Sequence, residues 1–221
     1  ADNKQRCASM NRLKVDFLDD GGIRVFNNGD GIPVEEHPKH KMMVPILVFG
    51  HLLTGSNYDD KKKKTTGGRN GYGAKCTNIY STKFVIETSD GERELTATWT
   101  DNMTGGAAAT PPAKGSVRVR KTKKKPYTQV TFYPDLSKFK VAQIPQGVRD
   151  VMVRRVHDVA GCTDASLRVS LNGEVLRTRN FSTYCEQFPA HSGSGSMRVY
   201  DETDRWKVCV MPNDHDLGQQ S

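Results

Sequence analysis

The sequence has no cysteine pair, no long apolar run and neither of the two best-known phosphate-loop signatures. Its five cysteines are widely spaced and none forms a C-x-x-C pair, which argues against both a zinc site and the disulfide framework of a small secreted domain. His37 and His40 have the spacing of a metal pair, but no cysteine or acidic residue has helpful spacing. Surface histidines are the simpler interpretation, so no metal ligand is predicted.

The chain also has no candidate membrane segment. The longest apolar stretch, Met42–Leu53, is interrupted by Pro45, Gly50 and His51, and it is shorter than the ~20 residues that cross a bilayer. The first twelve residues are polar and contain no signal peptide. A partnership with a membrane is therefore not expected. Because the chain starts at Ala1 and not at methionine, we expect the natural start to lie upstream.

What is present is an ordinary globular composition with a basic excess. Hydrophobic residues make up 35% of the chain, and together with the glycines this is enough for a core. Lysine and arginine exceed aspartate and glutamate by 33 − 25 = 8, and the sequence pI is near 9.3. This excess favours polyanion partners such as nucleic acid or nucleotides, although many basic proteins bind neither.

The patterning predicts an α+β protein. Alternating runs at Leu13–Leu18 and Ile23–Asn28 flank Asp19–Gly22 and form a hairpin. Further strands are expected at 83–88, 93–99, 117–120, 127–133, 167–171, 174–176, 197–200 and 206–211, and helices at 1–11, 44–53, 74–80 and 141–160. Hairpin-linked strands with helices at intervals indicate a layered sandwich with a mixed, mostly antiparallel sheet. We place a domain boundary near Ser182, which gives domains 1–182 and 183–221.

Two glycine-rich segments are candidates for ligand binding. The first, Asn27–Pro33, follows a strand and has glycines one residue apart. Glycines without a Cβ let the backbone approach a ligand, and an asparagine amide suits an adenine edge. A plain turn is the alternative, because Asn-Gly and Asp-Gly are common turn dipeptides.

The second segment, Gly67–Lys75, leads into a predicted helix. Its backbone amides, with Arg69 and Lys75, are typical of an anion-binding concavity. It is not a Walker loop, because Ala74 separates Gly73 from the lysine and a cysteine stands where Ser or Thr would hold magnesium. The dinucleotide fingerprint does not fit the glycine spacing either.

Together these segments resemble the GHKL ATPases, a family that includes the gyrase B subunit, the MutL mismatch-repair proteins and histidine kinases. Within the family, the ATPase domain of eukaryotic topoisomerase II is the best match. The similarity spans nearly the whole chain and rests on 27–33, 52–60, 66–75, 80–84, 127–139 and 152–155. It implies the Bergerat fold, a two-layer α/β sandwich, with the start of a transducer domain after residue 182.

The resemblance implies an ATP site between the sheet and a lid. Asn27 faces the adenine, Thr128 lies near the base, residues 55–57 border the ribose and phosphates, and residues 68–75 wrap the triphosphate. The site residues it implies are Asn27, Gly29, Gly31, Ile32, Gly55, Ser56, Asn57, Gly68, Arg69, Asn70, Gly71, Tyr72, Gly73, Ala74, Lys75 and Thr128. The family normally has serine at Gly55, so one hydroxyl contact is lost.

The chain departs from the family at its N-terminus. The family helix reads E-x-x-x-N-A-x-D, in which Glu is the general base and Asn holds Mg²⁺. Asp2 matches the final Asp, so the Glu and the Asn are expected upstream of Ala1, and this chain carries no catalytic or metal residue of its own. We therefore expect a fragment, cut short at both ends, that hydrolyses ATP weakly or not at all although its parent is an ATP-hydrolysing enzyme.

The implied function is that of an ATP-operated homodimeric clamp that drives DNA double-strand passage and relaxes supercoils. ATP and Mg²⁺ are the implied cofactors, and the nucleus, or else an organelle, is the implied location. A non-hydrolysing nucleotide- or DNA-binding module of a degenerate GHKL homologue is the alternative. Basic runs at Lys61–Lys64 and 118–125 either are solvated loop charge or contact DNA phosphates.

Overall fold

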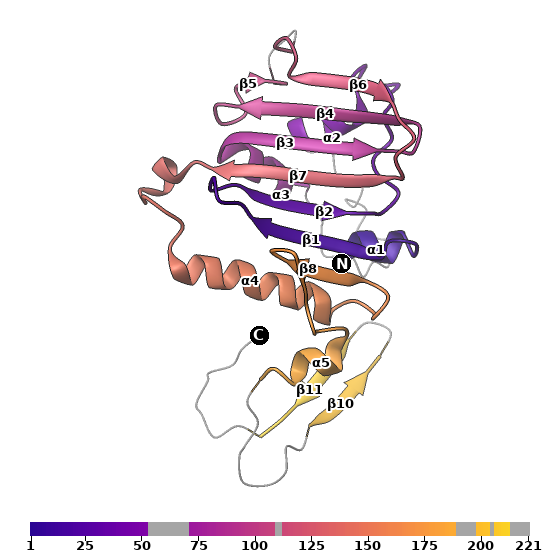
Figure 1. The fold of residues 1–221 in the computed structure, drawn as a ribbon, viewed down its shortest axis with the longest axis vertical. Helices are drawn as coiled ribbons and strands as arrows, with labels where there is room; N and C mark the ends of the chain where they lie inside the picture. The colour runs from indigo at the N-terminus through magenta and orange to yellow at the C-terminus, as the bar shows by residue number, and fades with distance from the viewer. Residues whose placement is uncertain (53–70, 109–111, 189–197, 204–205, 213–221) are drawn as a thin grey trace.

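A nine-stranded sheet forms the body of the protein (Figure 1). The structure, a computed structural model, describes residues 1–52, 71–108, 112–188, 198–203 and 206–212. The strands are β1 (Arg12–Phe17), β2 (Ile23–Asn27), β3 (Ser81–Ser89), β4 (Arg93–Thr100), β5 (Gly105–Gly106), β6 (Val117–Lys121), β7 (Tyr127–Pro134), β8 (Arg168–Leu171) and β9 (Glu174–Val175). Their order is β5-β4-β3-β7-β2-β1-β8-β9, with β6 also paired to β4. Among the described strands only the β1–β8 pair is parallel, which confirms the mixed, mostly antiparallel sheet.

Five α-helices and one 3₁₀ helix accompany the strands in the described part of the chain. They are α1 (Asp2–Arg6), α2 (Val44–Gly50), α3 (Gly73–Ile79), the 3₁₀ helix η1 (Leu136–Phe139), α4 (Gln146–Gly161) and α5 (Phe181–Cys185). A separate hairpin joins β10 (Val199–Glu202) and β11 (Lys207–Val210). None of the helices among these residues is both long and apolar enough to span a bilayer.

Several predicted boundaries were wrong. The first helix ends at Arg6 and not at Asn11, because Cys7 already has non-helical backbone angles. The long helix begins at Gln146 and not at Val141, because Pro145 stands at its N-cap, where its missing N–H costs nothing. Helix α5 and strand β5 were not predicted. The domain boundary near Ser182 falls inside α5 and stays a prediction.

The strand register places both hydrophobic clusters on one face of the sheet. Leu13 pairs with Asn27, Asn27 with Thr128, Thr128 with Thr88, and Thr88 with Leu95. Side chains in one such row share a face. One cluster packs Phe49 of α2 against strands β3 and β4, and the other packs Val156 and Ala160 of α4 beside β8, with Leu13 of β1 at its edge.

The other face of the sheet carries polar and aromatic side chains. Its central row runs from Lys14 through Phe26 and Gln129 to Glu87. In Figure 1, α2 and α3 lie behind the upper strands, and the viewer sees the opposite face of β3, β4 and β7 uncovered by any helix. The architecture is therefore two layers, with helices on one side only.

Candidate functional site

The end of β2 is fixed by the side chain of Asn27. Its Oδ1 accepts a hydrogen bond from the backbone N–H of Gly29 at 3.1 Å and another from Nδ2 of Asn3 at 3.0 Å. Two donors converge on one oxygen, so the orientation of the amide is determined. No hydrogen bond joins its Nδ2 to another residue in the described part of the chain, so this group can donate to a ligand.

Gly31 lies where the chain crosses the end of β3. Its φ is +75°, and a Cβ at this position would lie 1.9 Å from the carbonyl oxygen of Ser89. No side chain fits in that space, so glycine is required here for contact as well as for backbone angle. Glycine at position 31 is therefore required by a contact with a distant strand, which a plain turn would not involve.

The hydroxyl of Thr88 connects this glycine segment to β7. The backbone N–H of Ile32 donates to Thr88 Oγ1 at 3.0 Å, and that hydroxyl donates to the carbonyl oxygen of Tyr127 at 2.9 Å. Thr88 Oγ1 also lies 3.2 Å from Thr128 Oγ1. Asn27 and Thr128 are direct partners in the β2–β7 register. The structure thus brings together Asn27, Gly29, Gly31, Ile32 and Thr128.

The second predicted segment enters α3 on the same side of the sheet. Gly71 has φ of +64°, and α3 begins at Gly73, close to the predicted start at Ala74. Lys75 is only 4% exposed, and burial lowers the pKa of its ammonium. A buried ammonium is stable only beside a counter-charge or hydrogen-bond acceptors. Lys75 is therefore suited to holding an anionic ligand.

Six predicted site residues lie outside the described part of the chain, so their placement stays a prediction: Gly55, Ser56, Asn57, Gly68, Arg69 and Asn70. The same holds for the basic run 61–64. Of the predicted residues in α3 and just before it, Tyr72, Gly73 and Ala74 are exposed and Lys75 is buried. Helix α3 contacts β3 and β7. Thr77 of α3 lines one hollow with Phe132, which shares a face of β7 with Thr128, the partner of Asn27. The asparagine and α3 therefore lie on the same face of the sheet.

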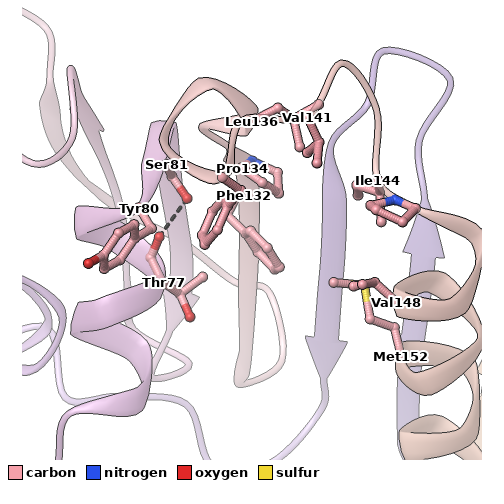
Figure 2. A pocket seen from close by; sticks show the side chains of 12 residues that line it. Thr77, Tyr80, Ser81, Phe132, Pro134, Leu136, Val141, Ile144, Val148 and Met152 are labelled. Atoms are coloured by element: carbon pink, nitrogen blue, oxygen red, sulfur yellow. Dashed lines mark hydrogen bonds between the residues drawn. The ribbon is translucent and has the colours of Figure 1, made fainter.

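An apolar hollow lies elsewhere on the helix-covered face (Figure 2). It has a volume of about 380 Å³ and is bounded by α3, β7, η1 and α4. Its side chains include Phe132, Val148 and Met152, and Ser81 Oγ donates to the carbonyl oxygen of Thr77 at 2.6 Å. A triphosphate needs amide and cationic donors, which these walls do not supply. The hollow is not the predicted nucleotide site.

Known proteins match this chain along its whole length, although no family model matches it. DNA topoisomerase 2 of Pisum sativum is 45% identical over 229 residues, which cover 100% of this chain and 15% of that protein. DNA topoisomerase 2-alpha of Homo sapiens is 42% identical over 229 residues, with 100% and 14% covered. The crystal structure of the ATPase region of Saccharomyces cerevisiae topoisomerase II matches with a TM-score of 0.80 and 39% identity, covering 94% of this chain and 53% of that chain.

The chain belongs to the topoisomerase II ATPase-region family. The sequence match and the shared fold agree, since a likeness at 39% identity and a TM-score of 0.80 covers nearly all of this chain. The fold is accordingly the GHKL sandwich. The chain spans about 15% of the length of the curated topoisomerase relatives.

Two residues that contribute to the candidate site were not predicted from the sequence. Asn3 reaches Asn27 from α1 across 24 positions, and nothing in the local sequence indicates this contact. Thr88 is fully buried at a core-facing strand position. A buried polar side chain usually makes hydrogen bonds. The alternation of apolar residues in β3 places Thr88 on the core face, so its hydrogen-bonding role could have been predicted from the sequence.

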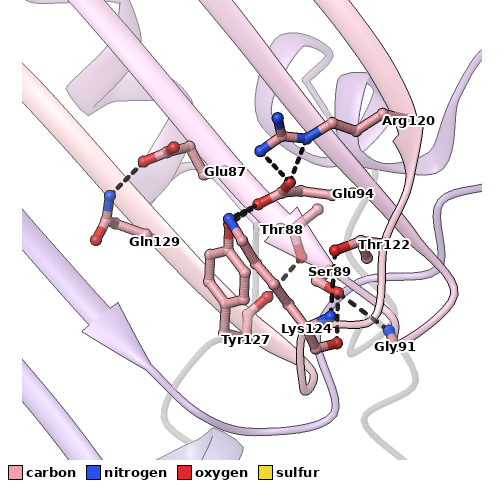
Figure 3. A network of polar contacts seen from close by, with 10 residues as sticks. All are labelled: Glu87, Thr88, Ser89, Gly91, Glu94, Arg120, Thr122, Lys124, Tyr127 and Gln129. Carbon is pink, nitrogen blue, oxygen red and sulfur yellow. Dashed lines mark hydrogen bonds and ion pairs between the residues drawn. The ribbon is translucent and has the colours of Figure 1, made fainter.

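A buried carboxylate ties the strand of Thr128 to the basic run 118–125 (Figure 3). Glu94 is 2% exposed and accepts hydrogen bonds from Arg120 at 2.6 Å, from Lys124 at 2.5 Å and from the Tyr127 hydroxyl at 2.5 Å. Burial alone would raise the pKa of Glu94, but these three donors outweigh it and lower the pKa to about 2. Arg120 and Lys124 are therefore engaged in the fold, whereas Lys123 and Lys125 are exposed.

Proposed function

We propose that this chain binds ATP at the ends of β2 and β7, as part of an ATP-operated clamp in a type II DNA topoisomerase. The observation that carries the proposal is the row of Asn27, Thr128 and Thr88, closed by Gly31 where no Cβ fits. Asn27 offers an oriented amide to the adenine, and Thr128 offers a hydroxyl one strand away. The names of the relatives, topoisomerase II and its ATPase region, support the same ligand.

The phosphates are assigned to the segment before α3 and to Lys75. The buried ammonium is the charge that a polyphosphate would neutralise. Mg²⁺ would accompany the bound triphosphate and help to neutralise its charge. This chain's own residues would orient the base and hold the phosphates. In the whole enzyme, ATP binding would close two subunits around DNA, and ATP hydrolysis would be coupled to double-strand passage. We propose a homodimer and a nuclear location, with an organelle as the alternative.

Replacing Thr128 with valine is expected to weaken binding of a non-hydrolysable ATP analogue about 5- to 10-fold, the effect of losing one hydrogen bond of about 1 kcal/mol. Isothermal titration calorimetry with Mg²⁺ present measures it. Asn27→Ala should weaken binding by at least the same factor.

The matched control is Thr131→Val, the same change on the same strand. Thr131 pairs with Arg24 on the opposite face of the sheet, so analogue affinity should not change. Equal weakening by both threonine variants, or no analogue binding by the unmodified chain at millimolar concentration, would refute the proposed site.

A further inference from the structure

A polar groove lies on the helix-free face of the sheet, behind the proposed nucleotide site. Its floor is formed by Phe26 and Tyr127, which precede Asn27 and Thr128 in β2 and β7 and therefore point to the other side. The two rings stack with centroids 5.8 Å apart. The groove has a volume of about 520 Å³, with Arg12 and Lys125 among its walls. Arg12 also borders a smaller hollow that it shares with Arg168.

Four cations lie in or beside the groove. Arg12 and Lys125 line it, Arg168 lines the smaller hollow, and Lys14 lies two residues after Arg12 on the same face of β1. Arg12, Lys14, Lys125 and Arg168 are all exposed, and none of them forms an ion pair with another described residue. Asp30 is the one carboxylate among the described residues that line the two hollows. The cations therefore outnumber the single carboxylate in these linings, which favours a polyanion as the ligand.

The aromatic floor contacts the ammonium group of Lys14 and that of one further lysine, Lys124. Lys14 Nζ lies 5.6 Å from the centre of the Phe26 ring, and Lys124 Nζ lies 5.7 Å from the centre of the Tyr127 ring. Cation–π contact restricts both side chains. It also covers ring faces on which an unpaired base would stack, so the surface favours phosphate contacts over the stacking that single strands use.

The width of the surface matches a stretch of duplex backbone. Lys125 precedes β7, Lys14 lies on β1, and Arg168 lies on β8. From β7 through β2 and β1 to β8 there are three strand spacings, or about 14 Å. Successive phosphates of one DNA strand are about 3.4 Å apart along the axis, so the cations span about four base pairs.

We propose that the basic surface formed by Arg12, Lys14, Lys125 and Arg168, in and beside this groove, binds the phosphate backbone of double-stranded DNA without reading its sequence. The inference rests on the proposed function, because the topoisomerase relatives supply the class of nucleic acid. The two sites meet at Gly29, which lines the groove, but the groove cations lie on the face opposite to the side chains of Asn27 and Thr128.

The triple variant Arg12→Ala, Lys125→Ala, Arg168→Ala tests this groove. Fluorescence anisotropy with a 20-base-pair duplex between 50 and 200 mM salt should show at least about a 10-fold loss of affinity at the low-salt end. The slope of log affinity against log salt should become shallower by about 2.7, or about 0.9 for each lost phosphate contact. Thermal unfolding confirms that the variant is folded.

The control variant is Lys39→Ala, Lys114→Ala, Lys138→Ala, which removes the same charge from exposed positions outside the groove. It should change the affinity less than about 3-fold and leave the salt slope unchanged. Equal losses in the two triple variants, unchanged binding in the groove variant, or tighter binding of a single strand of the same length would overturn the groove. Titration with the ATP analogue separates the two proposals, because the groove variant should bind nucleotide normally.

Discussion

Gly31→Ala is expected to destabilise the protein by more than about 3 kcal/mol and to abolish ATP-analogue binding. The alanine Cβ would lie 1.9 Å from the carbonyl oxygen of Ser89, so either the glycine segment or the end of β3 must move. Movement would break the bond from Ile32 N–H to Thr88 Oγ1 and displace Asn27. Backbone strain of this kind is among the few mechanisms that give effects of this size. Urea unfolding and calorimetry measure the two losses.

The control for backbone angle alone is Gly21→Ala. Gly21 has φ of +84°, similar to the +75° of Gly31, but a Cβ there would meet nothing within 4 Å. Its cost should be that of the left-handed angle, about 1–2 kcal/mol, with analogue affinity unchanged. If both alanines cost the same, steric contact with Ser89 is not what selects glycine in the nucleotide segment.

Local turn chemistry accounts for the parts of the fold that the sequence predicts well. Asn172 and Gly173 both have positive φ, at 50° and 84°, as their dipeptide predicts for a tight hairpin. The hairpin of β1 and β2 follows in the same way from Asp19–Gly22. In these cases the residues that determine the structure are neighbours in the chain, so their pattern is sufficient.

Long-range contacts account for what the sequence could not show. Glycine is required at position 31 because the chain meets Ser89, 58 positions later, and Asn27 is oriented by Asn3 of another element. The parallel pairing of β1 with β8 joins residues more than 150 positions apart. The family resemblance predicts which residues share the proposed nucleotide site, but only the register shows that Phe26 and Tyr127 form a second surface behind it.

The helix-free face and the nucleotide site share their supporting strands, which makes Glu94 important to both. Tyr127, whose hydroxyl donates to Glu94, directly precedes Thr128, and its stacking partner Phe26 directly precedes Asn27. Lys124 is held by the same carboxylate. Loss of the Glu94 charge would therefore leave Tyr127 less firmly held, and with it Thr128, the next residue of β7, on the opposite face.

Glu94→Gln is expected to cost about 3 kcal/mol at pH 7, because it removes a buried charge from two cations and a hydroxyl. Glu87→Gln is the control: the same change on the neighbouring strand, at a half-buried carboxylate bonded to the Gln129 amide. It should cost less than about 1 kcal/mol. Urea unfolding of the three proteins gives these differences in the free energy of unfolding.

The pH dependence of the Glu94 effect separates charge from packing. The pKa of Glu94 is about 2 in the folded protein and 4.5 ordinarily. A lowered carboxyl pKa stabilises the fold above the unfolded value, and this stabilisation is lost as the pH falls from about 4.5 towards 2. The difference between the unmodified chain and Glu94→Gln should therefore shrink by about 2 kcal/mol between pH 7 and pH 3. A difference that stays constant over this range would mean that side-chain shape, and not the ionised carboxylate, joins β4 to the strand of the nucleotide site.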